Sequence, residues 1–309
     1  MTLNSVFFNN YGRLRSGWRF SAFLASFIIC GVILGIFVQS FFGTAAADNS
    51  LFLLVNSAVS LLAALGLGWM FGRLLEDLPL KALGLAFTKG WPRHLIWGCF
   101  LGAWTLMIAV GIAAAASGYS FAANSAVGST PVLRSLVISF LVFAVAAAFE
   151  EVLFRGYILQ TFSRAGLSWL AIALTALFFA LVHAGNPSAN AISTLNTGLA
   201  GIWFGVAYLK TRDLWFPFGI HLLWNWTQGS VFGIEVSGLK EISRSPLLRE
   251  IDRGPDWITG GDYGIEAGIS TTIAILLSIA MIYYLPFLKA DEELVELTSR
   301  EQPVRSIVS

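Results

Sequence analysis

Charged side chains are scarce in this chain of 309 residues: 12% of the residues are charged and 56% are hydrophobic. The mean hydropathy of +0.73 lies far above the balance of a soluble domain. A net charge of +1 without clustered Lys and Arg excludes a phosphate-binding surface, so we expect no nucleic-acid partner. The composition instead predicts a protein whose environment is the lipid bilayer.

Cysteine and histidine are also rare. Cys30 and Cys99 both lie inside apolar runs, which excludes a disulfide framework. Of the three histidines, His94 lies at a predicted membrane edge, where we expect an interfacial role. His183 and His221 lie within or at the ends of apolar runs, where a polar ring needs a partner or a function.

Long apolar runs are abundant, and runs of about 20 residues suffice to cross a hydrocarbon core of about 30 Å. They predict an all-α fold, a polytopic membrane helix bundle of about eight transmembrane helices in a single domain, 1–309. The fourth run keeps helical spacing to Phe162, so its helix should exceed the bilayer thickness. The runs centre on residues 20–42, 51–72, 95–117, 134–154, 166–184, 190–209, 214–233 and 267–287.

Lysine and arginine fall unequally on the two predicted sides, fourteen on the side of the termini and five on the other. This bias predicts that both termini are cytoplasmic in an integral multi-pass protein of the cell (plasma) membrane. The first run is too long for a cleaved signal peptide, although "TAAAD" at 44–48 offers that alternative. We interpret 288–309 as a cytoplasmic tail and 235–265 as an extramembrane loop, with a lid over a substrate path as the alternative.

Three charges interrupt the fourth run, "AVAAAFEEVLFRGYIL". Each would cost roughly 2.5–3.5 kcal/mol near the bilayer centre if nothing compensated it. Glu151 and Arg155 are four residues apart on one helix face and can neutralise each other. Glu150 is rotated by about 100° from Glu151, so we expect its partner to come from another helix.

Further polar side chains lie on the following runs. An antiparallel hairpin would bring His183 close to the level of the glutamates, and His221 shares a helix face with Asn225. A carboxylate can take a proton from water, an imidazole can position that water, and the other donors can hold an oxyanion, which describes peptide-bond hydrolysis. Alternatively His183, His221 and Glu150 could bind a divalent metal such as zinc that activates the water. The sequence leaves both routes open.

Three motifs follow one another on successive apolar runs: "EEVLFR", "FALVH" and "HLLWN". Together they resemble the CAAX protease and bacteriocin-processing family (Abi, type II CAAX prenyl endopeptidase-like), intramembrane proteases commonly labelled metalloproteases. The resemblance covers roughly 134–230, the predicted motif-bearing catalytic core. The motif residues are Glu150, Glu151 and Arg155, then Phe179 and His183, then His221 and Asn225.

The resemblance implies a helical bundle that hydrolyses peptide bonds of membrane-associated, in some members lipidated, protein or peptide substrates. By this analogy Glu150 is the general base, His183 helps to activate the water, and His221 with Asn225 stabilises the oxyanion. Glu151 and Arg155 are the supporting pair. Prenyl specificity is not carried over, because some relatives have no known substrate.

Two other kinds of membrane protein also contain charged side chains within the membrane. A proton-coupled membrane transporter needs relays of acids and histidines, but it predicts internal repeats with broken helices, and the sequence shows no such repeat. A non-catalytic membrane scaffold or immunity protein would keep the polar cluster only for helix packing.

Overall fold

Helices make up 74% of the protein in its computed structural model. The structure describes residues 3–43, 50–125, 127–239, 242 and 244–301; the alternative cleavage pattern at 44–48 and the last part of the predicted tail lie outside these residues. The elements are α1 (Leu3–Phe7), α2 (Ser16–Phe42), α3 (Ser50–Glu76), η2 (Leu80–Leu83), α4 (Trp91–Ser117), β1 (Ser120–Ala123), α5 (Ser129–Glu151), η3 (Val152–Ile158), α6 (Leu159–Arg164), α7 (Ser168–His183), α8 (Ala191–Thr211), α9 (Trp215–Trp226), η4 (Thr227–Val231), β2 (Leu248–Ile251), α10 (Asp256–Thr259), η5 (Gly261–Tyr263), η6 (Ile265–Ala267), α11 (Ile269–Tyr284) and α12 (Glu292–Ser299).

Each of the eight apolar runs contains a helix. Within the described residues, five helical segments are long and apolar enough to cross a membrane: α2, α3, α4, α5 with its continuation, and α8. Helices α7 and α11 are apolar but have 16 residues each, and α9 has 12.

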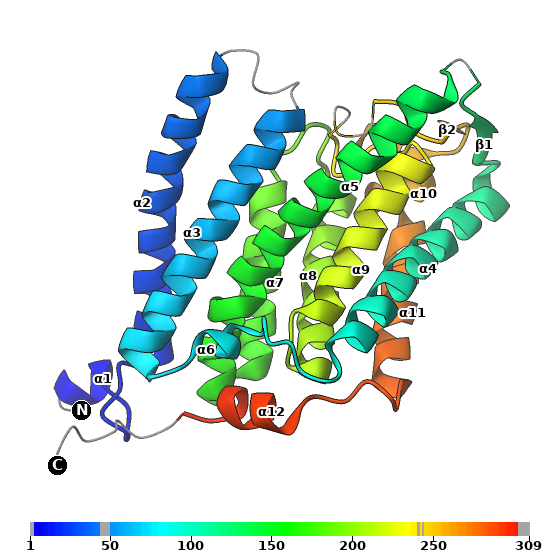
Figure 1. Ribbon diagram of the computed structural model, residues 1–309. Helices are drawn as coiled ribbons and strands as arrows, with labels where there is room; N and C mark the ends of the chain where they lie inside the picture. Colours follow the sequence, from blue (N-terminus) through cyan, green and yellow to red (C-terminus); the bar gives the residue numbers. More distant parts are fainter. Residues whose placement is uncertain (1–2, 44–49, 126, 240–241, 243, 302–309) are drawn as a thin grey trace.

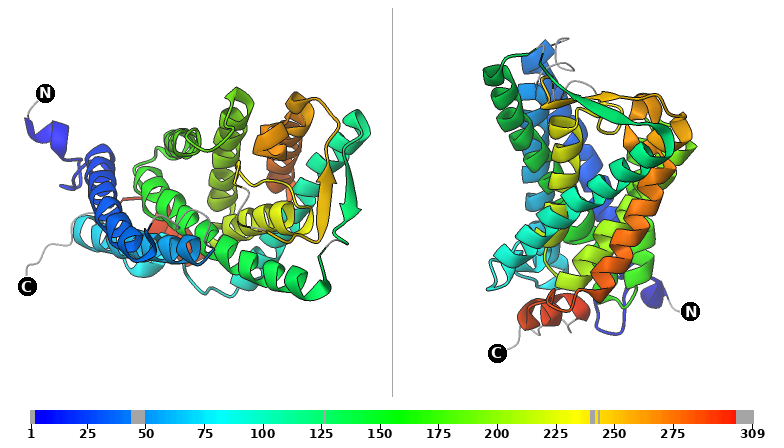
Figure 2. Two further views of the ribbon diagram at one scale, coloured as in Figure 1. Left: turned by 90° about the horizontal axis from the view of Figure 1, so that it is seen from above. Right: turned by 90° about the vertical axis from the view of Figure 1, so that its right-hand side faces the viewer.

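The long helices form two layers (Figure 2). Helices α7, α8 and α11 make one layer, and α3, α5, α9 and α4 make the other, with α2 packed against α3 at one edge. Helices α1 and α12 lie at one end of the bundle, whereas β1, β2 and the segment between α9 and α11 lie at the opposite end (Figure 1). The connecting segments at this opposite end therefore lie near the ends of both layers.

The fourth helix is continuous over 36 residues, Ser129–Arg164, as the apolar spacing predicts. It ends before Gly166, whose φ of 79° is a left-handed conformation that favours glycine. Nearer its C-terminal end, Val152–Ile158 form a π-helix, a widening that the sequence did not predict and that is frequent at functional sites.

Large apolar side chains cover the outside of the bundle. On α2, Ile29, Ile33 and Ile36 are 62%, 61% and 67% exposed. Such a surface is costly in water and suits hydrocarbon, where helices satisfy their own backbone hydrogen bonds. Together with the five spanning helices, it identifies an integral multi-pass membrane protein.

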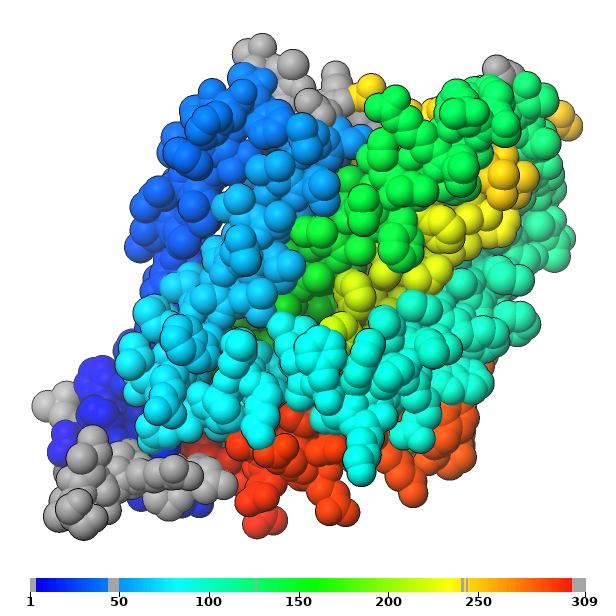
Figure 3. Space-filling model, viewed as in Figure 1, coloured from blue at the N-terminus to red at the C-terminus, as the bar shows by residue number. Residues whose placement is uncertain are grey.

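Helices α4 and α9 pack at unusually close range. A Cβ at Gly98 would lie 2.3 Å from the Phe216 oxygen, and one at Gly102 would lie 2.2 Å from the Ile220 oxygen. Glycine at these positions lets two backbones touch. In Figure 3, α9 is visible as a narrow band between α5 and α4.

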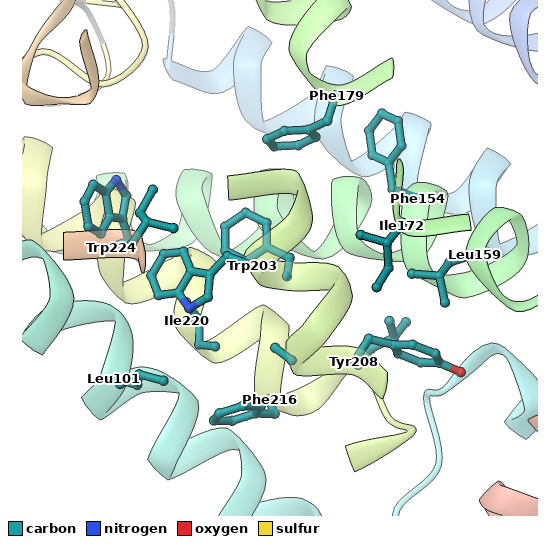
Figure 4. Packing of buried hydrophobic residues seen from close by; sticks show 14 of the residues in the cluster. Leu101, Phe154, Leu159, Ile172, Phe179, Trp203, Tyr208, Phe216, Ile220 and Trp224 are labelled. Carbon is teal, nitrogen blue, oxygen red and sulfur yellow. The ribbon is translucent and has the colours of Figure 1, made fainter. Parts of the chain in front are cut away.

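The apolar core lies between the two layers. Trp203, Phe216 and Ile220 are no more than 1% exposed and meet the side chain of Leu101 (Figure 4). These residues fix the depth and rotation of α8 and α9, which carry functional candidates.

A two-stranded sheet departs from the predicted all-α fold. Strands β1 and β2 pair antiparallel, with Ser120 opposite Ile251. Four-residue strands joined across a long stretch of chain leave no periodic signal, so the sequence could not predict them. The sheet lies outside the helices, and part of the predicted extramembrane loop is thereby ordered.

Four arginines that were counted for membrane orientation are buried. Arg13, Arg19, Arg155 and Arg164 are 5%, 0%, 0% and 5% exposed. Arg164 lies 2.8 Å from a carboxylate oxygen of Glu76, and Arg19 lies 3.4 Å from the other oxygen. These side chains stabilise contacts between helices and do not mark the membrane surface.

Candidate active site

A cavity of about 130 Å³ lies between the two helical layers, in the half of the bundle away from α1 and α12. Its walls come from α5, α7, α8, α9 and α11, and the segment after η4 covers it. Four of the predicted site residues line it together: Glu150, His183, His221 and Asn225. The structure thus brings together side chains from three helices.

Glu151 and Arg155 form the predicted ion pair, with Nη1 of Arg155 donating to Oε1 of Glu151 at 3.1 Å. The same Oε1 accepts a hydrogen bond from Nδ1 of His221 at 2.9 Å. Nη2 of Arg155 donates to the Gly201 carbonyl at 3.1 Å. Glu151 and Arg155 are 1% and 0% exposed, and His221 connects the pair to the cavity.

Aromatic rings surround this buried pair. The Arg155 guanidinium lies 5.1 Å from the ring centres of both Phe179 and Phe204, within the range of cation–π attraction. The His221 ring stacks on Phe204 at 4.7 Å with an interplanar angle of 15°. Phe204 on α8 therefore contacts both Arg155 and His221. These contacts fix the positions of the guanidinium and the imidazole relative to each other.

Glu150, like Glu151, has His221 of α9 as its neighbour, so its partner comes from another helix, as its rotation predicted. Its Oε2 lies 3.7 Å from Nε2 of His221, and its side chain is 23% exposed. That oxygen has no hydrogen-bond partner among the described residues. A polar contact of this length leaves room for a bridging water in a cavity of this size.

His183, the last residue of α7, is oriented by its own helix. Its Nδ1 lies 2.8 Å from the Phe179 carbonyl oxygen. Because a carbonyl oxygen only accepts hydrogen bonds, Nδ1 carries the proton and Nε2 is left with the lone pair. The ring lines the cavity, so Nε2 is the nitrogen available to water or substrate.

Sequence reasoning missed Glu266, which also lines the cavity. Its Oε2 accepts hydrogen bonds from the backbone N and the Oγ of Ser237 at 2.6 and 2.9 Å, and its Oε1 accepts one from Nε1 of Trp224 at 3.2 Å. Burial raises the pKa of the Glu266 carboxyl, while the hydrogen bonds from Ser237 and Trp224 act in the opposite direction. The one available signal was a carboxylate directly ahead of the last apolar run.

The cavity does not present a preassembled metal centre. Within the described residues, no three His, Cys, Asp or Glu side chains are grouped so that they could hold a metal ion. Glu150 and His221 approach each other at 3.7 Å, and His183 is oriented by the Phe179 carbonyl. Metal binding by His183, His221 and Glu150 therefore stays a prediction.

His94 lies in the first turn of α4 and does not line the cavity. Its ring is 1% exposed, and Nδ1 lies 2.5 Å from a carboxylate oxygen of Asp213. The structure thus places it in a buried contact that joins α4 to the start of α9.

The comparison with known families finds one match. Residues 132–227, about a third of the chain, match the family described as type II CAAX prenyl endopeptidase Rce1-like. No curated protein matches the chain. The matched segment begins in α5 and ends just after α9, so it includes all three motifs. The resemblance seen in the motifs is confirmed over this segment: residues 132–227 are similar to the Rce1-like type II CAAX prenyl endopeptidase family.

Proposed function

We propose that this protein is an intramembrane endopeptidase, of the CAAX type, that hydrolyses peptide bonds of membrane-associated protein or peptide substrates. The observation that carries the proposal is the convergence of Glu150, His183, His221 and Asn225 on one cavity within the helical bundle. A carboxylate, two imidazoles and a carboxamide supply the base and the donors that amide hydrolysis requires.

Glu150 is the general base in this proposal. Its unpartnered oxygen takes a proton from a water in the cavity, and Nε2 of His183 orients that water. The resulting hydroxide adds to the peptide carbonyl carbon. The proton held by Glu150 then passes to the leaving amine as the C–N bond breaks.

His221 and Asn225 hold the oxyanion. Nδ1 of His221 already donates to Glu151, so the ring donates to the oxyanion when Nε2 also carries a proton. Glu151 stabilises that doubly protonated ring, much as a buried carboxylate orients the histidine of a catalytic triad. Arg155 donates to Glu151 and keeps its carboxylate in place.

The proposal includes the arrangement in the membrane. Eight crossings with both termini cytoplasmic are supported by the common end at which α1 and α12 lie and by the excess of Lys and Arg on that side. This excess persists without the four buried arginines. The cavity then opens in the outer half of the bilayer. The proposed units are a single domain, 1–309, a catalytic core, 134–230, an extramembrane loop, 235–265, and a cytoplasmic tail, 288–309, in the plasma membrane.

Binding of a divalent metal such as zinc stays a prediction, which a chelator experiment can test. If His183 and His221 acquire a metal with Glu150, a strong chelator should abolish cleavage, and zinc should restore it. Turnover that persists in metal-depleted protein would support hydrolysis by Glu150 and water alone.

The decisive experiment compares protein termini in membranes of cells expressing wild type or Glu150→Ala at equal, verified levels. Glu250→Ala serves as the control, because Glu250 lies on β2 and does not line the cavity. We expect new termini with wild type and the control but not with Glu150→Ala. Full proteolysis by a folded Glu150→Ala protein would refute the assignment.

A further inference from the structure

Glu266 joins four parts of the molecule at the cavity. Its carboxylate accepts hydrogen bonds from Ser237 in the segment after η4 and from Trp224 on α9. Its backbone oxygen accepts a hydrogen bond from Asn196 of α8 at 2.8 Å, and α11 begins three residues later.

The segment that Glu266 holds is conformationally strained. Ser237 has a φ of 52°, a left-handed conformation that non-glycine residues rarely adopt. Its carbonyl accepts a hydrogen bond from Asn186 at 3.1 Å, and a Cβ on the next residue, Gly238, would lie 2.1 Å from the Pro187 oxygen. Such a conformation persists only where the surroundings fix it, and it is common at functional sites.

This segment forms one wall of the cavity. Val236, Ser237 and Leu239 all line it, and the turn they form is closed by a hydrogen bond from the Leu239 N–H to the Val236 oxygen. We call residues 236–239 the roof. Since the roof covers the cavity at the loop end of the bundle, its position sets the space left for a peptide.

Trp224 links the same carboxylate to the candidate catalytic helix. It lies next to Asn225 and three residues after His221, and its indole packs edge-on against Trp203 at 5.8 Å. A hydrogen bond from its Nε1 therefore fixes the rotation of the part of α9 that presents both proposed oxyanion donors.

We propose that Glu266 is a positioning residue for hydrolysis, which acts through Ser237 to hold the roof and through Trp224 to hold the oxyanion donors. The inference rests on the proposed function. It extends the candidate active site beyond the matched segment, 132–227. Glu266 binds no substrate atom in this role. It joins the roof and the catalytic helix into one rigid wall.

Glu266→Gln tests the role with minimal change of shape. A carboxamide has one accepting oxygen, so its NH2 group must face a donor, either Nε1 of Trp224 or the two donors of Ser237. Trp224→Phe removes Nε1, so the carboxamide NH2 no longer faces a donor on that side. In the double variant the oxygen of the introduced carboxamide can therefore accept from Ser237, which should restore the roof.

The first readout does not depend on activity. Leu239→Cys is placed in a protein with Cys30→Ser, Cys99→Ser and Glu150→Gln, purified in detergent, and labelled with a maleimide. We expect Glu266→Gln to raise the labelling rate about tenfold, the effect of losing one hydrogen bond to a charged group. Adding Trp224→Phe should return the rate to that of Trp224→Phe alone, and Glu250→Gln should leave it unchanged.

The second readout is the cleavage rate of a substrate identified from the termini experiment. With Glu150 intact, Glu266→Gln should lower kcat about tenfold with little change in KM, and Trp224→Phe should rescue it to the level of Trp224→Phe alone. An unchanged labelling rate, or a fall in kcat that only follows a lower melting temperature, would overturn the proposal. If wild type cleaves nothing, the proposed function fails, and the labelling alone decides whether Glu266 holds the roof.

Discussion

Arg155 is a charged side chain with no exposed surface in the middle of a membrane bundle. It is tolerated because Glu151, the Gly201 carbonyl and two aromatic rings surround its guanidinium. A buried pair of this kind adds little stability over an apolar packing, but removing one partner leaves an uncompensated charge. The role of the Glu151–Arg155 pair is to orient His221.

Arg155→Gln should therefore be strongly destabilising, by about 3–5 kcal/mol. Arg155→Lys keeps the charge but loses the planar fork that reaches both Glu151 and Gly201, so we expect a smaller loss of about 1.5–3 kcal/mol. Thermal unfolding of both variants in detergent measures the difference. Equal melting temperatures for the two variants would contradict a role for the charge.

At this scale the sequence predicts contacts within one helix. The Glu151–Arg155 pair follows from a spacing of four residues. The bridge from His221 to both glutamates does not, since it depends on the rotation of α9 against α5. Glu266 was missed for the same reason: its partners come from α8, α9 and the roof.

Helix α4 shows how an element outside the motifs can control the site. Gly102 touches the backbone of Ile220, the neighbour of His221, whereas Gly111 on the same helix has open space around it. Gly102→Ala should force α4 and α9 apart, with a loss of about 1–3 kcal/mol and reduced cleavage. Gly111→Ala, the matched control, should be neutral or stabilise by up to about 1 kcal/mol. Melting temperatures and cleavage rates of the two variants check this, and equal behaviour would contradict it.

The two-stranded sheet carries a pH-sensitive contact. Oη of Tyr119 donates to Oε2 of Glu250 at 2.5 Å, and burial raises the pKa of Glu250 from 4.5 to about 7, against the effect of that hydrogen bond. A raised folded pKa means that the folded sheet binds the proton more tightly than the unfolded one. The stabilising contribution of the proton on Glu250 is full below about pH 4.5 and is lost as the pH rises through about 7.

Amide hydrogen exchange of β1 and β2, corrected for intrinsic rates, should therefore show lower protection at pH 8 than at pH 5. Glu250→Gln should abolish the difference, because it removes the titrating group. Identical protection of the wild-type strands at both pH values would refute the prediction.

At the scale of elements, the spacing and length of the apolar runs predict the helices that the membrane environment requires. All eight apolar runs became helices, and the fourth continued to Arg164 as expected. The π-helix and the sheet arise from tertiary contacts, which apolar spacing does not encode. The predicted loop, 235–265, contains the roof, and its contact with the cavity could not be predicted without the positions of α8 and α9.

The whole molecule has a sidedness that can be measured. Exposed positions near β2 and on α12 lie at opposite ends of the bundle. In a protein with Cys30→Ser and Cys99→Ser, a membrane-impermeant maleimide should label Arg253→Cys from outside intact cells. It should label Glu292→Cys only after permeabilisation, and the reverse pattern would invert the proposed topology.

Helix lengths in this bundle differ widely. The 16 residues of α7 and α11 span roughly 24 Å, less than a typical hydrocarbon core of about 30 Å, whereas the fourth helix greatly exceeds it. In the proposed arrangement both helices cross the membrane, and local thinning of the bilayer is one way to accommodate their short length; both border the cavity. A peptide anchored in the membrane would there cross less hydrocarbon to reach Glu150, so we expect lipids with shorter acyl chains to speed its cleavage in reconstituted vesicles.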